Sequence, residues 1–173
     1  MRIVVPFTQV HPLVDAALTK LAPDAERIDV SARVDSYHEL MERLWREGET
    51  FLVIEHDNEP TARAIRQARF CSCWWSVSPY RGPGVTFASA TNLIVGLGFT
   101  RFRKQLMAAE PDLMSEVGEI NDGRSVGRQD WRRLDARMYG ALRRRGYRQH
   151  VHEPPVKHHH AYGYGCACGE EHG

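Results

Sequence analysis

The first third of the chain alternates short apolar runs with segments whose apolar residues recur every three or four positions. The apolar runs at residues 2–5, 27–30 and 50–55 predict three strands. Helical spacing between them predicts two helices, one over residues 12–21 and one from Asp35 or Ser36 to Gly48. The order β-α-β-α-β predicts parallel strands joined by right-handed helical crossovers.

The pattern continues with shorter elements. The segments predict, in turn, a helix (60–70), an aromatic-rich strand (71–80), a short helix (102–109), a loop (112–127) and a longer helix (130–145). The chain shows no internal repeat and no linker. We therefore expect one domain over residues 1–160, followed by a Gly/Cys/His tail over residues 161–173.

Composition supports a single globular domain. The chain has 173 residues, of which 42% are hydrophobic and 26% are charged. The formal net charge of +1 argues against strong attraction to nucleic acid or anionic lipid. Residues 124–148 hold nine arginines, which suit either a phosphate-binding face or a solvated helix surface. We find neither a signal peptide nor a membrane span in the sequence, so we expect a cytoplasmic protein.

An acidic cluster ends the third predicted strand. The apolar run stops abruptly at Glu55, His56 and Asp57. In open α/β sheets, ligands bind in the crevice at the carboxyl ends of the strands. Two carboxylates with an imidazole between them suit a divalent cation that bridges protein and phosphate. The alternative is an ordinary strand end that turns into a polar loop.

Histidines recur near the end of the predicted domain, at positions 150, 152, 158 and 160. Residues two apart in an extended chain point the same way, so these imidazoles could share one face. Pro154 and Pro155 prevent a helix there. Neutral imidazole is a ligand for manganese, zinc or iron, although some of these side chains could equally be solvated loop histidines.

Cysteines form two Cys-x-Cys pairs. In the tail, Cys166, Cys168 and His172 make a candidate site for a structural Zn²⁺, with a fourth ligand from the other pair or a histidine. Free thiols on an exposed tail are the alternative. Cys71 and Cys73 fall in a predicted apolar strand, where core packing is the favoured interpretation.

Carboxylates also mark the start of the last long predicted helix. Asp130 and Asp135 could each act as a general base, and a carboxylate at that place can also simply cap the helix. Capping is the expected role for one of the two.

Together these motifs resemble the GT-A class of nucleotide-sugar glycosyltransferases, in particular the small family-2-like enzymes of the compact type encoded by bacteriophages. Glu55-His56-Asp57 stands at the place of that family's metal-binding acidic motif, and Val156-Lys157-His158 matches its late histidine motif. Residues 91–98 match its glycine-containing acceptor segment. The resemblance covers residues 1–160 and implies a three-layer α/β/α sandwich with a mostly parallel central sheet.

The resemblance also implies roles for individual residues. Asp130 would be the catalytic base, and the cation would be held by Asp57 and His158, with His160 as a further candidate ligand. The donor-binding residues would be Pro6, Phe7, Thr8, Asp35, Glu55 and His56.

The implied activity is that of a metal-dependent inverting glycosyltransferase. It would use Mn²⁺ or Mg²⁺ to move a sugar from a nucleoside diphosphate to a hydroxyl acceptor, in a host cytoplasm if the protein is phage-encoded. Modified DNA bases, proteins and small molecules remain open as acceptors. A nucleotidyltransferase is disfavoured, because residues 5–9 lack a glycine-rich phosphate loop. The alternative from another class is a non-catalytic, zinc-stapled module that binds nucleic acid through aromatic and arginine side chains.

Overall fold

The structure is a computed structural model, and it describes residues 1–82, 85–86, 96–119 and 134–159. The predicted β-α-β-α-β order is present in β1 (Arg2–Phe7), α1 (Pro12–Leu21), β2 (Glu26–Asp29), α2 (Ser36–Glu47) and β3 (Phe51–Ile54). At the start of α1, Nδ1 of His11 accepts a hydrogen bond of 3.3 Å from the backbone N–H of Leu13. Gly48 ends α2 with a φ of 69°, a conformation that favours glycine.

Shorter elements make up the rest of the described chain. They are β4 (Asn58–Glu59), α3 (Ala62–Phe70), β5 (Trp75–Val77), β6 (Tyr80–Gly82), β7 (Val85–Thr86), β8 (Phe99–Phe102), α4 (Lys104–Ala109), α5 (Leu113–Glu119), α6 (Leu134–Arg144), β9 (His150–Val151) and β10 (Val156–His158).

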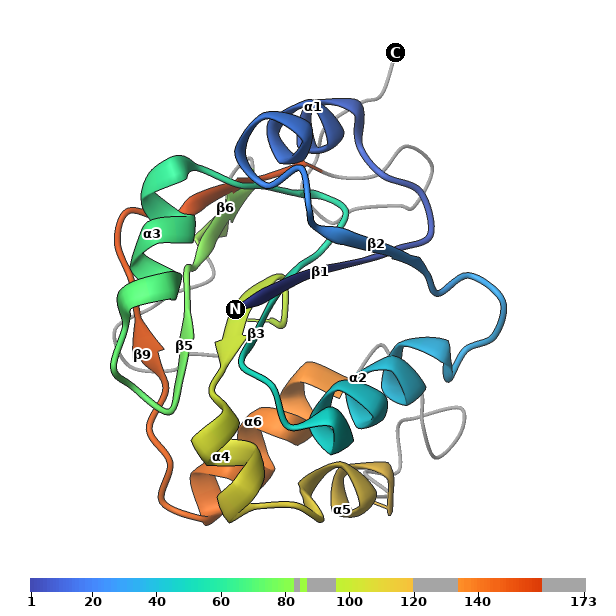
Figure 1. Cartoon of the computed structure of the whole chain (residues 1–173), viewed down its shortest axis with the longest axis vertical. Coiled ribbons are helices and arrows are strands. Elements are labelled where there is room, and N and C mark those ends of the chain that lie inside the picture. The colour runs from blue at the N-terminus through green and yellow to red at the C-terminus, as the bar shows by residue number, and fades with distance from the viewer. Residues whose placement is uncertain (83–84, 87–95, 120–133, 160–173) are drawn as a thin grey trace.

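A six-stranded mixed sheet forms the centre of the molecule, in the order β2-β1-β3-β8-β5-β9 (Figure 1). Its pairings are parallel except on the two sides of β8, which runs antiparallel to β3 and β5. The carboxyl ends of β1, β3 and β5 therefore lie at one edge. A smaller sheet, ordered β4-β10-β6-β7, joins the chain that follows β3 to its late strand β10.

The central sheet is buried on both faces, because alternate side chains along each strand point in opposite directions. Val4, Phe51 and Val53 pack with α2, α4, α5 and α6, whereas Leu52 and Ile54 belong to a second cluster with α1 and α3. Figure 1 shows the same division, with α1 and α3 on one side of the sheet and the other helices opposite. The arrangement is a mixed α/β sandwich.

Strand β8 differs from the sequence prediction, which began a helix at residue 102. The strand ends at Phe102, and the helix begins only at Lys104. Arg101 conceals the strand in the sequence, since an arginine is rarely buried. Its side chain is only 2% exposed, and its Nη1 donates to the backbone oxygens of Cys71 (2.7 Å) and Ala68 (3.2 Å).

Two further segments correct the predictions. Residues 112–127 were expected to form a loop, but α5 occupies part of that segment because Leu113, Met114 and Val117 are buried in the core. The predicted strand over residues 71–80 is shorter, and Cys71 and Cys73 lie in the partly exposed loop before β5. Core packing of these cysteines was therefore a wrong interpretation.

The capping residue at the start of helix α3 contributes to stability in a way that a substitution can test. Thr61 occupies the N-cap position, and its Oγ1 accepts a hydrogen bond of 3.1 Å from the backbone N–H of Ala64. We expect Thr61→Ala to lower the free energy of unfolding by about 1 kcal/mol in urea denaturation. Asp35→Ala is the matched control, because Asp35 stands at the N-cap of α2 without a capping side-chain bond. Equal losses in the two variants would contradict this account.

No helix in the described ranges combines the length and the apolar character needed to cross a membrane.

Candidate functional site

The acidic cluster lies where the sequence predicts it, at the carboxyl end of β3. Two backbone hydrogen bonds hold it against its neighbours. The N–H of Glu55 donates to the oxygen of Gly98 (2.8 Å), and the N–H of His11 donates to the oxygen of His56 (3.0 Å). The loop is thus tied to the segment before β8 and to the start of α1.

Asp57 and His158 face one another across the smaller sheet. Antiparallel pairing of β4 and β10 places His158 opposite Asn58, and Nε2 of His158 lies 3.0 Å from Oδ2 of Asp57. The other carboxylate oxygen accepts a hydrogen bond of 2.9 Å from the side-chain amide of Asn58. Burial alone would raise the pKa of Asp57, but the hydrogen bond and charge of His158 outweigh it, so the pKa is lowered.

Glu55 has the opposite electrostatic environment. Burial, then the negative charges of Asp57 and Asp135, raise its pKa from 4.5 to about 8, although a hydrogen bond from Tyr37 opposes the shift. The Tyr37 hydroxyl on α2 donates to Oε1 of Glu55 at 2.8 Å. Asp135 belongs to the first turn of α6. Carboxyl groups from the loop after β3 and from α6 therefore act on one another at this edge of the sheet.

A second pair of histidines flanks Asp57. Nε2 of His159 lies 2.8 Å from a carboxylate oxygen of Glu59, and the backbone N–H of His159 donates to the oxygen of Asp57 (2.6 Å). The His159 ring stacks on His11, with ring centroids 4.3 Å apart. Burial and the neighbouring His159 lower the pKa of His11. Four imidazoles, those of His11, His56, His158 and His159, thus surround the carboxylates.

The predicted donor-binding residues share this edge in part. Pro6 and Phe7 end β1 beside Ile28 and Asp29 of β2, and Thr8 follows as an exposed residue. Pro6 therefore continues the strand that it was expected to break. Asp35 stands at the N-cap of α2, and its Oδ1 accepts from Arg33 at 3.0 Å.

Several predicted site residues lie outside the described residues. They are Asp130, His160, Cys166, Cys168 and His172. The predicted acceptor segment, residues 91–98, is described only from Gly96 onward. The late histidines divide between two places, since His158 meets Asp57 whereas His150 lies on β9, in the other sheet.

Tyr37 and His159 were not identified as site residues from the sequence. Tyr37 fits the apolar stripe of α2, because its ring is buried and only its hydroxyl reaches Glu55. The pattern of hydrophobic positions does not show whether the hydroxyl of a buried tyrosine reaches a functional site. His159 is separated from Glu59 by 100 residues, so only the pairing of β4 with β10 shows its place.

The donor set fits a hard or borderline divalent cation. Adjacent ligands of an octahedral ion with bonds of about 2.1 Å are about 3.0 Å apart, which matches the separation of Nε2 of His158 and Oδ2 of Asp57. Burial, together with the negative charges of Asp57 and Asp135, keeps Glu55 mostly protonated at neutral pH, because its pKa is about 8. A cation here would offset those negative charges, so the side chains present suit one.

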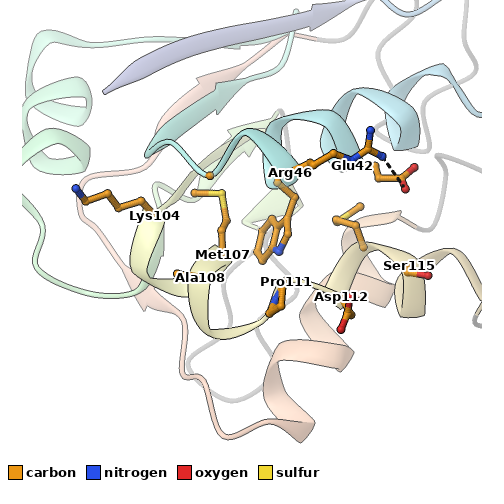
Figure 2. A pocket seen from close by; sticks show the side chains of 11 residues that line it. Glu42, Arg46, Lys104, Met107, Ala108, Pro111, Asp112 and Ser115 are labelled. Carbon is orange, nitrogen blue, oxygen red and sulfur yellow. Dashed lines mark hydrogen bonds and ion pairs between the residues drawn. The ribbon is translucent and has the colours of Figure 1, made fainter.

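The described structure also has a cavity of about 440 Å³ away from this edge (Figure 2). It lies between the end of α2 and helices α4 and α5, near the amino end of β3. Its lining includes the charged side chains of Arg46, Lys104 and Asp112. None of the residues of the acidic cluster lines it, so it is separate from the candidate site.

Comparisons with known proteins give only distant similarities. No family model matches the chain, and no curated protein matches it in sequence. Among solved structures, A197 from STIV matches with a TM-score of 0.46 and 14% identity, over 87% of this chain and 81% of that one. A glycosyltransferase involved in the glycosylation of the major capsid of PBCV-1 matches with a TM-score of 0.47 and 10% identity, over 88% and 82% of the two chains.

A third similar structure is a Bacillus anthracis protein assigned as a glucose-1-phosphate thymidylyltransferase. Its TM-score is 0.45 and its identity 11%, over 89% of this chain and 68% of that one. Similarities at this level carry no conclusion about family or activity. A function for this chain is therefore inferred from its own residues.

Proposed function

We propose that this protein is a metal-dependent glycosyltransferase that takes a sugar from a nucleoside-diphosphate donor. One observation carries the proposal. Asp57 and His158, which are 101 positions apart in the sequence, meet at 3.0 Å at the sheet edge where α/β folds bind ligands. The pair is only partly exposed, and it lies beside the carboxyl groups of Glu55 and Asp135.

Asp57 and His158 are the proposed metal ligands. Mg²⁺ and Mn²⁺ sites in transferases commonly use one or two protein side chains and leave the remaining positions to water and substrate phosphates. A cation held there would supply Lewis-acid stabilisation of the charge that develops on the departing diphosphate. The Asn58 side-chain amide, which donates to Asp57, would fix the orientation of the carboxylate.

The donor is proposed to lie along the ends of β1 and β3. Phe7, Thr8 and Glu55 stand at that edge, and Asp29 or Asp35 could accept hydrogen bonds from the base or ribose. Tyr37 would hold the Glu55 carboxyl in place through its hydroxyl. These assignments follow from position at the edge and from hydrogen-bonding capacity.

The general base is proposed to come from the start of the last long helix. Asp130 remains the prediction from the sequence, and Asp135 is the candidate within the described part of the chain. The charge of Asp135 reaches both Glu55 and Tyr37. A carboxylate there would accept the proton of the acceptor hydroxyl as its oxygen attacks the anomeric carbon. In-line attack opposite the leaving diphosphate inverts the configuration at that carbon.

A thermal-shift panel of nucleoside diphosphates and their sugars, with and without Mn²⁺, tests the proposal. We expect one nucleotide to raise the Tm only when Mn²⁺ is present. Ligand at a hundred times its Kd stabilises the folded state by about 2.7 kcal/mol, which corresponds to about 5–10 °C for a chain of this size.

The controls are Mn²⁺ alone and each nucleotide with EDTA. Salt-dependent binding of DNA without any nucleotide-dependent shift would contradict the transferase and favour the nucleic-acid-binding module. Transfer assays with modified DNA, protein and small hydroxyl compounds would then identify the acceptor class of an active protein.

A further inference from the structure

Two cysteines and a histidine meet at the edge of the central sheet opposite the acidic cluster, where β5 and β9 begin. Cys71 and Cys73 lie in the loop between α3 and β5, and His150 begins the edge strand β9. One ligand atom from each of the three lies within 4.8 Å of the others. Among the described residues, these three form the group of His, Cys, Asp or Glu side chains that meets this distance for a possible metal ion.

The spacing is close to that of a zinc site. Zn–S bonds of about 2.3 Å and Zn–N bonds of about 2.0 Å at tetrahedral angles separate neighbouring ligand atoms by about 3.5–3.8 Å. The three side chains are partly or fully exposed, so small rotations can adjust ligand atoms that already lie within 4.8 Å of one another to that separation. Residues two apart in an extended loop also present their side chains to the same side.

Two arginine side chains hold the backbone of the cysteine loop, residues 71–73. Arg101 donates through Nη1 to the backbone oxygen of Cys71 at 2.7 Å, and through Nη2 to that of Cys73. Arg103 donates to the oxygen of Ser72. The backbone oxygens of Cys71, Ser72 and Cys73 thus all accept hydrogen bonds from guanidinium groups, which fixes the backbone that carries the two thiols. Support of this kind around a ligand loop is typical of metal sites.

A buried positive charge lies beside the cysteines, although burial and the neighbouring Cys71 raise the pKa of Cys73 in the metal-free protein. Arg101 is 2% exposed, and in the described part of the chain its side chain donates to carbonyl oxygens and to no carboxylate. A buried cation without a paired anion is costly. Thiolates at Cys71 and Cys73 would balance Arg101 and supply the sulfur ligands that zinc prefers to the harder Mn²⁺ and Mg²⁺.

We propose that Cys71, Cys73 and His150 bind a structural Zn²⁺ that ties strand β9 to the loop before β5. This site is separate from the Asp57–His158 site and does not depend on the proposed transferase activity. Strand β9 has two residues, His150–Val151, and among the described strands it pairs with β5 alone. A metal bond to His150 would anchor the chain that leads on to β10.

Metal content is the direct test. Full-length protein expressed with zinc and purified in a reducing buffer should contain about one zinc per chain by elemental analysis. Replacement by Co²⁺ should give the near-ultraviolet thiolate-to-cobalt charge-transfer bands. Cys71→Ser, Cys73→Ser and His150→Gln should each lose the zinc, and chelation should lower the Tm of the wild type by about 5 °C or more. Wild-type protein without zinc and without cobalt–thiolate bands would overturn the proposal.

Matched variants separate this site from other candidates. Asp57→Asn should keep both the zinc and the cobalt–thiolate bands, because its site offers no sulfur. The double variant Cys166→Ser/Cys168→Ser tests the tail. Zinc that is lost from the tail variant but retained in Cys71→Ser and Cys73→Ser would overturn the proposal. Zinc that is retained in the tail variant but lost from Cys71→Ser and Cys73→Ser is the expected result.

A second substitution at His150 keeps the test valid even if His150→Gln fails to fold. His150→Cys replaces the imidazole by another zinc ligand and is expected to restore zinc binding, with stronger charge-transfer bands in the cobalt form. If His150→Cys behaves like His150→Gln in metal content, His150 is not a ligand.

Discussion

Asp57→Asn is expected to lower Mn²⁺-dependent sugar transfer on the order of a thousand-fold, and to remove the metal-dependent nucleotide shift in Tm. The substitution keeps the side-chain shape and one of the two accepting oxygens, which can accept from Asn58 or from His158 but not from both. It removes the negative charge that a divalent cation requires. The loss should therefore appear in kcat/KM and metal affinity, which transfer kinetics measured over a Mn²⁺ titration would report.

Glu59→Gln is the matched control for Asp57→Asn. Glu59 lies two residues further on and interacts with His159, so its neutralisation changes the same loop without touching Asp57. We expect it to retain most activity. Sugar transfer that persists in Asp57→Asn, or that proceeds in EDTA at the wild-type rate, would show that the proposed mechanism is wrong.

Glu55→Gln is expected to stabilise the metal-free protein at alkaline pH. The folded-state pKa of Glu55, about 8, lies above its ordinary value of 4.5. The stability that the protonated carboxyl contributes is fully present below pH 4.5 and is lost as the pH rises through 8. A glutamine stays neutral and can still accept the hydrogen bond from Tyr37. At pH 8 the variant should exceed the wild type by about 3–4 kcal/mol in the free energy of unfolding.

Urea denaturation in EDTA across pH 4–9 would measure this difference. The gap between Glu55→Gln and wild type should close toward pH 4.5. Glu116→Gln provides a control of opposite sign, because the hydrogen bond from Arg145 lowers the pKa of Glu116. That variant should be slightly less stable than the wild type at pH 8. Destabilisation by Glu55→Gln at pH 8 would mean that burial and the neighbouring carboxylates do not raise the pKa of Glu55 as described above.

The gain in stability expected for Glu55→Gln and the loss of transfer expected for Asp57→Asn both arise from carboxyl groups held close together at one edge of the sheet. The negative charges that oppose one another in the metal-free protein are the charges that a bound cation would neutralise. Sites that bind charged ligands are often destabilising until the ligand is present. Mn²⁺ should therefore stabilise the wild type more than it stabilises Glu55→Gln.

Much of the amino-terminal half was predictable from the sequence because its signals are local. The helix over residues 12–21 and the stop at Gly48 follow from spacing and a single glycine, and both are confirmed. The strand that ends at Glu55 is also confirmed within one residue. Each of these signals lies within one helix or strand and does not depend on distant contacts.

Features that depend on distant contacts were not predictable. Strand β8 carries Arg101, whose burial makes sense only because the carbonyls of the α3–β5 loop surround it. Helix α5 is short, and its apolar residues are buried by packing with α2 and α6. A local sequence pattern does not show such packing, so the segment was predicted to be a loop. In the candidate site, the late histidine segment was recognised, but its division between Asp57 and the cysteine loop depends on which strands pair.

The pairing of β4 with β10 has a consequence for biosynthesis. Asp57 and Glu59 leave the ribosome about a hundred residues before the histidines that accompany them. Contacts over such separations form late, because closing a long loop costs entropy before any contact compensates it. A nascent chain would thus hold its amino-terminal sheet before it could hold a metal ion. We expect this protein to acquire activity as the final step of its folding, after the rest of the scaffold is in place.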